Sequence, residues 1–174
     1  MKLKKTSITN YRCFKEAEID FDEHTTLIVG KNGAGKTAIL DAVAVAISTF
    51  LLGIDGGVSR SISKDDARYE FYDLDGTVDP QHQFPVSIES TGDCLDNHDV
   101  KWVRSLNSES GNTTVKEARE LTNISKNTQK RIMTGDKSLI LPLISYYGTG
   151  RLYAQKKEKK NMIFQRLIFI AILH

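Results

Sequence analysis

Residues 27–37, LIVGKNGAGKT, place a short apolar run directly before a glycine-rich loop and a lysine–threonine pair. They fit the pattern G-x-x-x-x-G-K-[ST] at Gly30, Gly35, Lys36 and Thr37. Glycines let the backbone turn tightly and direct successive N–H groups at phosphate oxygens. The order of run, loop and helix-forming residues predicts an α/β fold with a phosphate-binding loop.

Each position of the loop has a chemical task. Lys36 is expected to place its ammonium against the β and γ phosphates, and Thr37 is the predicted ligand of Mg²⁺. The first turn of the following helix adds partial positive charge. The predicted contacts with a nucleotide triphosphate therefore lie at Gly30, Gly33, Ala34, Gly35, Lys36, Thr37 and Ala38.

The composition limits the number of domains, but it does not indicate a binding partner. The 174 residues, 40% of them hydrophobic, suffice for one domain, and the formal net charge is only +2. Cys13 and Cys94 form no CxxC pair, which favours a reducing cytoplasmic setting. The apolar residues 162–174 are interrupted by Gln165 and Arg166 and are too short to cross a bilayer, so we expect no membrane span.

The hydrophobic pattern of the first third predicts five segments. Residues 2–11 and 16–21 read as strands, and the apolar run 25–30 reads as a buried strand that leads into the loop. Residues 36–52 lack internal Gly and Pro and predict a buried helix closed by Gly53. The Gly, Ser and Asp residues of 53–66 predict a surface loop.

The rest of the chain adds three predictions. Residues 84–91 and 99–106 alternate apolar with polar side chains and predict an antiparallel pair joined by a long loop, 92–98. Residues 113–133 have helical spacing, with Thr114 as N-cap and Gly135 as stop. Residues 138–148 read as a second buried strand, in which Pro142 favours an edge or a bulge. We expect a central sheet around 25–30 and 138–147, with an antiparallel β layer beside it.

A nucleotide hydrolase of this kind also needs an acid at the end of another buried strand. Only Glu89, in an alternating strand, comes near that pattern. The sequence therefore predicts slow or undetectable hydrolysis and names no catalytic residue.

Two stretches resemble known proteins. Residues 8–44 resemble the N-terminal lobe of ATPases of the SMC, RecF and ABC type, with a strand, a turn containing Arg12, and the same variant of the loop. LPLISYYGTGRLY, residues 141–153, is similar to a segment of predicted ATP-binding proteins of the Septu antiphage PtuA type.

The resemblance implies a P-loop lobe over residues 1–157, followed by a basic then apolar tail, 158–174. It implies that Arg12 lies near the phosphates or the base, and Asn32 near the γ phosphate. Arg151 becomes a candidate contact to a phosphate or a partner lobe, although such segments also serve in packing. Gln155 lies where related proteins place a Mg²⁺-contacting glutamine, but a solvated polar residue fits as well.

The resemblance also implies cofactors and partners. These are ATP and Mg²⁺, a homodimer or larger ATPase assembly, an HNH-type nuclease and DNA, with antiphage defence or DNA maintenance as the setting. Hydrolysis would need a C-terminal lobe that these residues lack.

Two alternatives remain open at this point. A small P-loop kinase would need a lid with several arginines, for which Arg60 and Arg68 in residues 58–68 are the candidates. A nucleotide-gated interaction module would bind ATP without turning it over.

Overall fold

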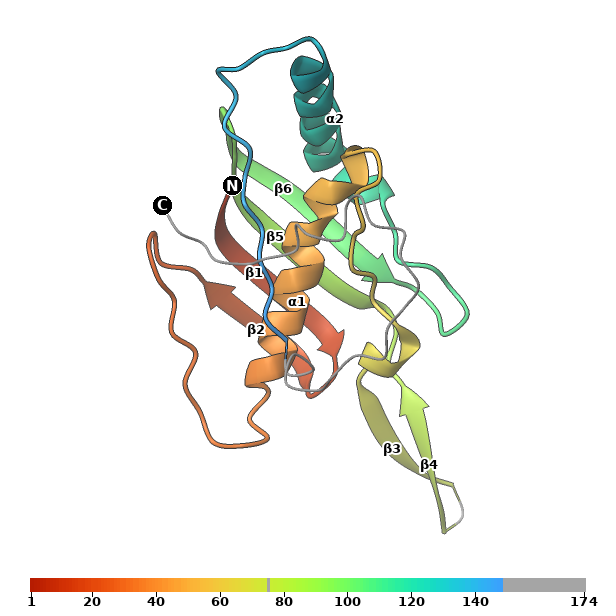
Figure 1. The fold of residues 1–174 in the computed structure, drawn as a ribbon. Helices are drawn as coiled ribbons and strands as arrows, with labels where there is room; N and C mark the ends of the chain where they lie inside the picture. The colour runs from red at the N-terminus through yellow and green to blue at the C-terminus, as the bar shows by residue number, and fades with distance from the viewer. Residues whose placement is uncertain (75, 149–174) are drawn as a thin grey trace, which may run out of the picture.

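A four-stranded antiparallel sheet is the framework of the computed structural model, which describes residues 1–74 and 76–148 (Figure 1). Its strands are β1 (Lys2–Tyr11), β2 (Phe14–Asp20), β5 (Val86–Cys94) and β6 (Asn97–Leu106), in the order β2-β1-β5-β6. Ile8 of β1 lies opposite Ala17 of β2 and Ile88 of β5. The predicted strands at 2–11, 16–21, 84–91 and 99–106 are confirmed.

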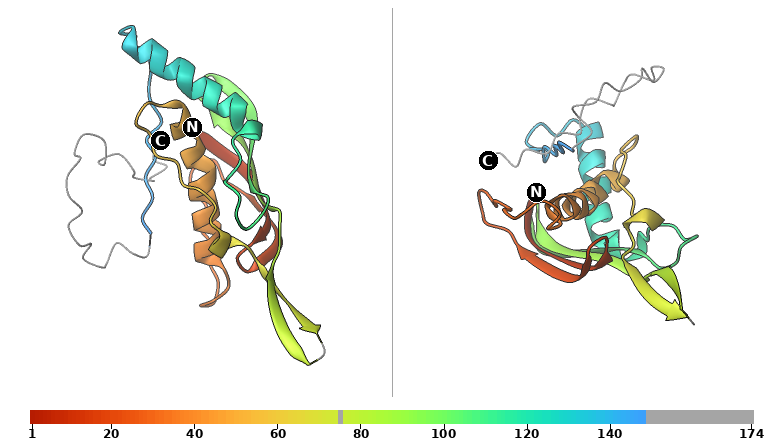
Figure 2. Two further views of the ribbon diagram at one scale, coloured as in Figure 1. Left: turned by 90° about the vertical axis from the view of Figure 1, so that its right-hand side faces the viewer. Right: turned by 90° about the horizontal axis from the view of Figure 1, so that it is seen from below.

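Helix α1 (Lys36–Ser48) crosses one face of this sheet and continues into the short 3-10 helix η1 (Thr49–Gly53). Seen along the helix, the sheet curves around α1 (Figure 2, right). Every residue from Asp41 to Phe50 is buried, as the nearly continuous apolar sequence predicted. Ala42, Val45 and Ala46 pack with Ile8 and Ile88 in one core cluster.

A second cluster connects the far end of α1 to helix α2 (Arg119–Met133), which follows the short η3 (Lys116–Ala118). The buried Trp102 belongs to it, and its indole N–H donates to the carbonyl of Ala46 at 3.0 Å. Gly53 lies so close to α2 that an added Cβ would stand 1.9 Å from Ser125 Oγ. The contact between η1 and α2 therefore requires glycine at this position.

A hairpin of β3 (Tyr69–Leu74) and β4 (Thr77–His82) extends away from the sheet (Figure 1). The hairpin was not predicted from the sequence, because its many polar residues give no clear alternation of apolar and polar side chains. Phe71 and Val78 are exposed in the structure. The predicted loop that precedes it is confirmed as irregular except for η2 (Lys64–Asp66), and it is anchored by the buried Ile62.

The two predicted buried strands at 25–30 and 138–148 are wrong for this structure. Both segments run outside the sheet, with no regular strand assigned in either (Figure 1). Leu27 and Val29 are 81% and 78% exposed, and Ile140 is 85% exposed. Apolar sequence favours a buried strand only where a neighbouring strand and a covering layer exist. Within residues 1–74 and 76–148, neither segment pairs with a strand, although Ile144 is buried in the core cluster that contains Trp102.

Two boundaries also differ from prediction, and a third agrees with it. The turn between β5 and β6 takes only Leu95 and Asp96 rather than a long loop. Thr114 does not cap a helix, since its hydroxyl accepts the Ser105 N–H at 3.1 Å and α2 starts later. Gly135 does end α2, with a φ of 83° and a hydrogen bond to the Ile132 carbonyl.

One helical stretch, Lys36–Gly53, has the length and apolarity of a membrane span, but 67% of that window is buried inside the fold. A core helix of a globular domain meets the same criterion. The predicted tail, 158–174, lies outside the described residues.

Candidate nucleotide-binding site

The glycine-rich loop before α1 has the backbone conformation that its sequence predicted. Gly33 and Gly35 have φ values of 83° and 89°, a region that side chains with a Cβ rarely adopt. The Lys36 ammonium folds back over the loop and donates to the carbonyls of Gly30 and Lys31 at 2.7 and 2.8 Å. A lysine held in this way places its charge at the mouth of the loop.

The N-terminus of α1 is left open for an anion. Its N-cap residue is Gly35, no side chain caps it, and the first turn contains no acid. The first N–H groups of a helix have no partner within the helix, and they lie beside a hollow of about 340 Å³. Asn32, Gly33, Gly35, Lys36 and Thr37 line this hollow.

These residues fit a nucleotide phosphate chain with its metal. Free N–H groups, an ammonium and the helix end all favour negative charge. The Thr37 hydroxyl is a hard oxygen ligand of the kind Mg²⁺ takes, alongside phosphate oxygens and waters. The lining of the hollow therefore contains Lys36 and Thr37, the side chains expected from the sequence to contact phosphate and metal.

The turn between β1 and β2 packs directly against the loop. A Cβ added to Gly35 would lie 2.5 Å from the ring of Phe14 and 2.7 Å from Cys13 Sγ. Arg12 in the same turn has a φ of 50°, and its backbone N–H donates to the Asp66 carbonyl at 2.7 Å. The turn is therefore fixed on both sides, by the loop and by η2.

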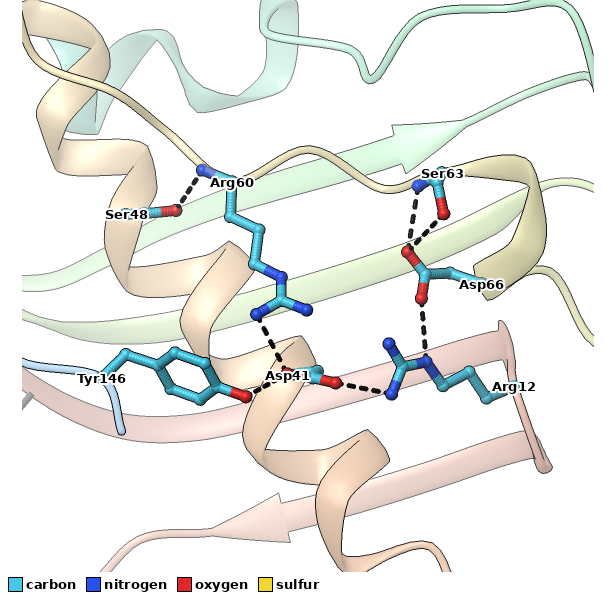
Figure 3. A network of polar contacts seen from close by, with 7 residues as sticks. All are labelled: Arg12, Asp41, Ser48, Arg60, Ser63, Asp66 and Tyr146. Atoms are coloured by element: carbon cyan, nitrogen blue, oxygen red, sulfur yellow. Dashed lines mark hydrogen bonds and ion pairs between the residues drawn. The ribbon is translucent and has the colours of Figure 1, made fainter. Parts of the chain in front are cut away.

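A polar network centred on Asp41 lies beside the site (Figure 3). Its buried carboxylate accepts from Arg12 Nη1 at 2.5 Å and from Arg60 Nη1 at 3.0 Å, and also from the Tyr146 hydroxyl. Arg12 Nε donates in turn to Asp66 at 2.8 Å. Three separate segments thus meet on the one carboxylate that α1 supplies, one helical turn beyond Thr37.

The network shifts the protonation equilibria of its members. Burial works against the charged guanidinium, but the Tyr11 hydroxyl and the carboxylates of Asp66 and Asp41 raise the pKa of Arg12. Burial likewise opposes ionisation of Asp66, yet hydrogen bonds from Ser63 and Arg12 lower its pKa. Burial and the bond to Asp41 raise the pKa of Tyr146. Arg12 and Asp66 are charged at neutral pH as a result.

The predicted site residues fall into three groups. Asn32, Gly33, Gly35, Lys36 and Thr37 come together around the hollow, while Gly30 and Ala34 belong to the loop itself. Ala38 has its side chain in the core and is not among the lining residues. Arg12 is beside the loop but is committed to two carboxylates and is not among the lining residues.

The network itself was not predicted from the sequence. Asp41 is the only acid between Lys36 and Leu52, and an isolated carboxylate within an apolar helix signals a buried partner. The sequence alone does not show which cations pair with Asp41, because Arg12 and Arg60 lie far from it along the chain.

Glu89, the one acid considered for hydrolysis, lies on the wrong face of the sheet. It is exposed on β5, whereas its neighbours Ile88 and Ser90 are buried, Ile88 in the cluster that packs against α1. Alternate residues of a strand point to opposite faces, so Glu89 points away from the loop. Arg151 and Gln155 lie outside the described residues.

Comparisons with known proteins show the family to which the chain is similar. The AAA domain family matches residues 5–170. A DNA replication and repair protein RecF of Flavobacterium johnsoniae is 54% identical over 43 residues, which are 25% of this chain and 12% of that protein. A DNA double-strand break repair Rad50 ATPase of Archaeoglobus fulgidus is 48% identical over 44 residues, 25% of this chain and 5% of that protein.

A solved structure from work on ATP-driven dimerization and DNA stimulated activation of SMC ATPases aligns with 82% of this chain and 87% of its own. Its sequence identity is 17% and its TM-score is 0.46. The curated relatives are much longer than the segments that this chain matches in them.

The family match spans nearly the whole chain and includes the loop, the helix and the β1–β2 turn described above. The resemblance to the N-terminal lobe of an SMC, RecF or ABC-type ATPase is confirmed in this coarser form, as is the α/β P-loop fold. The chain belongs to the AAA domain family.

Proposed function

We propose that this chain binds ATP together with Mg²⁺, as the P-loop lobe of an ATPase that serves DNA maintenance. One observation carries the proposal: the lining of the hollow at the uncapped N-terminus of α1 combines Lys36, Thr37 and the loop glycines. Lys36 would hold the β and γ phosphates, and Thr37 would hold the metal. Bound Mg²⁺ supplies neutralisation of the phosphate charge.

The preference for adenine and the setting come from the relatives. The loop contacts phosphates and carries no base-reading group. The Rad50 relative is described as an ATPase, and both relatives are described as DNA repair proteins. These descriptions support ATP and DNA maintenance for this chain as proposals.

We further propose that hydrolysis needs polypeptide beyond residues 1–148. Among the described residues, the two buried acids near the loop, Asp41 and Asp66, are each bound to arginine. Neither is free to hold Mg²⁺ or polarise a water. The exposed apolar side chains of Leu27, Val29 and Ile140 support the same view, since added strands would cover them.

A P-loop kinase is less well supported. Arg60 is bound to Asp41, and its guanidinium lies 5.3 Å from the centre of the Tyr146 ring. Arg68 is bound to Glu70 at 2.6 Å. Arginines held on their own domain do not form a lid that closes over a phosphate acceptor. A nucleotide-gated interaction module remains the second candidate, because the exposed apolar segments also suit a partner.

The finer prediction, antiphage defence with an HNH-type nuclease partner, rests on the YYGTGRLY segment. The structure describes only Tyr146 to Gly148 of it. Tyr146 serves the Asp41 network, which explains one residue of the segment without reference to any partner. Cytoplasmic location and a homodimeric assembly also stay predictions.

Calorimetric titration tests the proposal and separates its parts. We expect heat of association with MgATP, weaker binding when EDTA removes Mg²⁺, and a loss of that Mg²⁺ dependence in Thr37→Ala. Turnover by the chain alone should be undetectable. Robust hydrolysis that disappears in Lys36→Ala would instead show that a catalytic acid is present within these 174 residues. ATP-dependent dimerisation without turnover would favour the interaction module.

A further inference from the structure

The hairpin of β3 and β4 has one apolar face that is open to solvent. Phe71 and Asp73 of β3 lie opposite Pro80 and Val78 of β4, and side chains that lie opposite each other in a sheet share a face. Phe71 and Val78 are 72% and 63% exposed. In the described part of the chain, β3 and β4 pair only with each other. This surface, the hairpin face, consists of Tyr69, Phe71, Asp73, Val78 and Pro80.

The hairpin is also strongly acidic. Residues 69–82 contain four Asp or Glu residues and no Lys or Arg. Glu70 is paired with Arg68 at 2.6 Å, but no ion pair within residues 1–74 and 76–148 involves Asp73 or Asp79. Such a surface repels phosphates and attracts cationic protein surfaces. A partner that fits it presents apolar side chains with positive charge beside them.

A hollow of about 640 Å³ between α2 and η1 has this complementary chemistry. Its lining includes the apolar Leu52 and Met133, the latter 74% exposed, and the ammonium groups of Lys126 and Lys130. The carboxylate in the lining, Asp55, accepts a hydrogen bond from the Gln129 side chain. Two lysines against one carboxylate leave the hollow with a positive charge.

We propose that the hairpin face of one chain docks in the α2–η1 hollow of a second copy of the chain. Phe71 and Val78 supply the apolar surface that would cover Leu52 and Met133. Methionine suits this role, because its flexible thioether adapts to its neighbours and makes favourable contacts with aromatic rings. Asp73 and Asp79 supply the negative charges that the two lysines attract.

The positions of the two surfaces determine the kind of assembly. The hairpin and α2 lie at opposite ends of the domain (Figures 1 and 2), so a chain cannot fill its own hollow. The contact is therefore head to tail: it leaves a free hairpin at one end of the assembly and a free hollow at the other. Neither surface includes a residue that lines the hollow at Lys36, so the contact does not depend on nucleotide.

The contact is small, which sets its strength. One face of a hairpin with six residue pairs offers fewer residues than the roughly 20–30 per side of a standard interface. Association should therefore be weak and reversible. It should also weaken with added salt, because salt screens the attraction between exposed charges.

Sedimentation velocity of the whole chain, without nucleotide or Mg²⁺, tests the proposal. The weight-average sedimentation coefficient of the wild type should rise as the protein concentration goes from about 1 μM to about 1 mM. Phe71→Ala removes an exposed ring and should weaken association by about tenfold or more. Circular dichroism checks that each variant is folded.

A charge exchange identifies the two surfaces. Asp73→Lys with Asp79→Lys should abolish association, and so should Lys126→Glu with Lys130→Glu. An equimolar mixture of the two double variants should associate again, because each hairpin then meets a hollow of opposite charge. Lys101→Glu with Lys116→Glu is the matched control: both lysines are exposed, neither lines the hollow, and association should stay as in the wild type.

Four results would overturn the assignment. They are a wild-type chain that stays monomeric at every concentration, unchanged association in Phe71→Ala, an equal loss in the control double variant, and a mixture of folded charge variants that does not associate. Association that appears only with MgATP would place the interface at the glycine-rich loop and would also contradict it. MgATP titration of the same variants is independent and should match the wild type.

Discussion

Arg12 Nη1 lies 2.5 Å from Asp41 Oδ2, so the turn between β1 and β2 is tied by an ion pair to the helix that begins at the glycine-rich loop. The same guanidinium holds Asp66 through Nε at 2.8 Å. One arginine thus links the sheet, the helix and the segment before β3. The conformation of the loop depends on this frame, because the same turn packs on Gly35.

Replacing Asp41 by Asn should destabilise the fold by roughly 2–4 kcal/mol, somewhat less than a fully buried broken pair, since its arginine partners are partly exposed. Urea unfolding measures the change. Glu18→Gln, which breaks the exposed pair with Lys5, should cost much less, because solvent screens exposed ion pairs. Equal losses in the two variants would show that Asp41 is not the centre of the network.

Gly35→Ala should be more damaging than Gly33→Ala, although both residues have a positive φ. At Gly33 an added Cβ meets nothing within 4 Å, so only backbone strain of about 1–2 kcal/mol applies. At Gly35 the Cβ would collide with Phe14 and Cys13, which adds roughly 1–3 kcal/mol. Thermal unfolding of the pair measures the difference. Identical melting temperatures would mean that the turn does not pack on the loop.

Asp66 should contribute to stability in a pH-dependent way. Its pKa in the folded chain is lowered below the ordinary 3.8, so the fold favours the ionised form. The contribution is complete above the unfolded pKa and is lost as pH falls through the lower folded value. Asp66→Asn should therefore lower stability at pH 7 and flatten its decline below about pH 4.

The neighbouring Asp65 is the matched control for this pH dependence, because it is exposed and has no ion pair among the described residues. Asp65→Asn should leave the acid limb of the urea-derived stability curve as it is in the wild type. An unchanged acid limb in Asp66→Asn would contradict the assigned role.

Much of the fold followed from local pattern. The strands 2–11 and 99–106 alternate, and the helix after Gly35 is apolar throughout, so each could be predicted from its own residues. The backbone conformation of the glycine-rich loop followed from its glycines, because a positive φ is readily adopted only by glycine. Burial of residues 25–30 and 138–148 could not be decided locally, since it depends on whether other strands lie beside them. The Asp41 network could not be predicted for the same reason, because the side chains that contact Asp41 lie up to 105 residues from it in the chain.

The exposed run before the loop gives a prediction about the isolated chain. Leu27→Lys and Val29→Lys should each change the free energy of unfolding by less than about 0.5 kcal/mol, as for other exposed positions. Both should reduce binding of a hydrophobic dye. Ile88→Lys, in the buried core, should prevent folding. Losses at Leu27 comparable to those at Ile88 would show that residues 25–30 are already covered within this chain.

The central claim is that the loop and the first turn of α1 hold a nucleotide phosphate chain, and calorimetry of Lys36→Ala tests it most directly. Loss of a charge-assisted contact should weaken MgATP binding by about 10- to 100-fold. Lys31→Ala is the control, because only the Lys31 carbonyl meets Lys36 and its own side chain does not line the hollow. MgATP binding that is unchanged in Lys36→Ala, or absent from folded wild-type protein, would contradict the account.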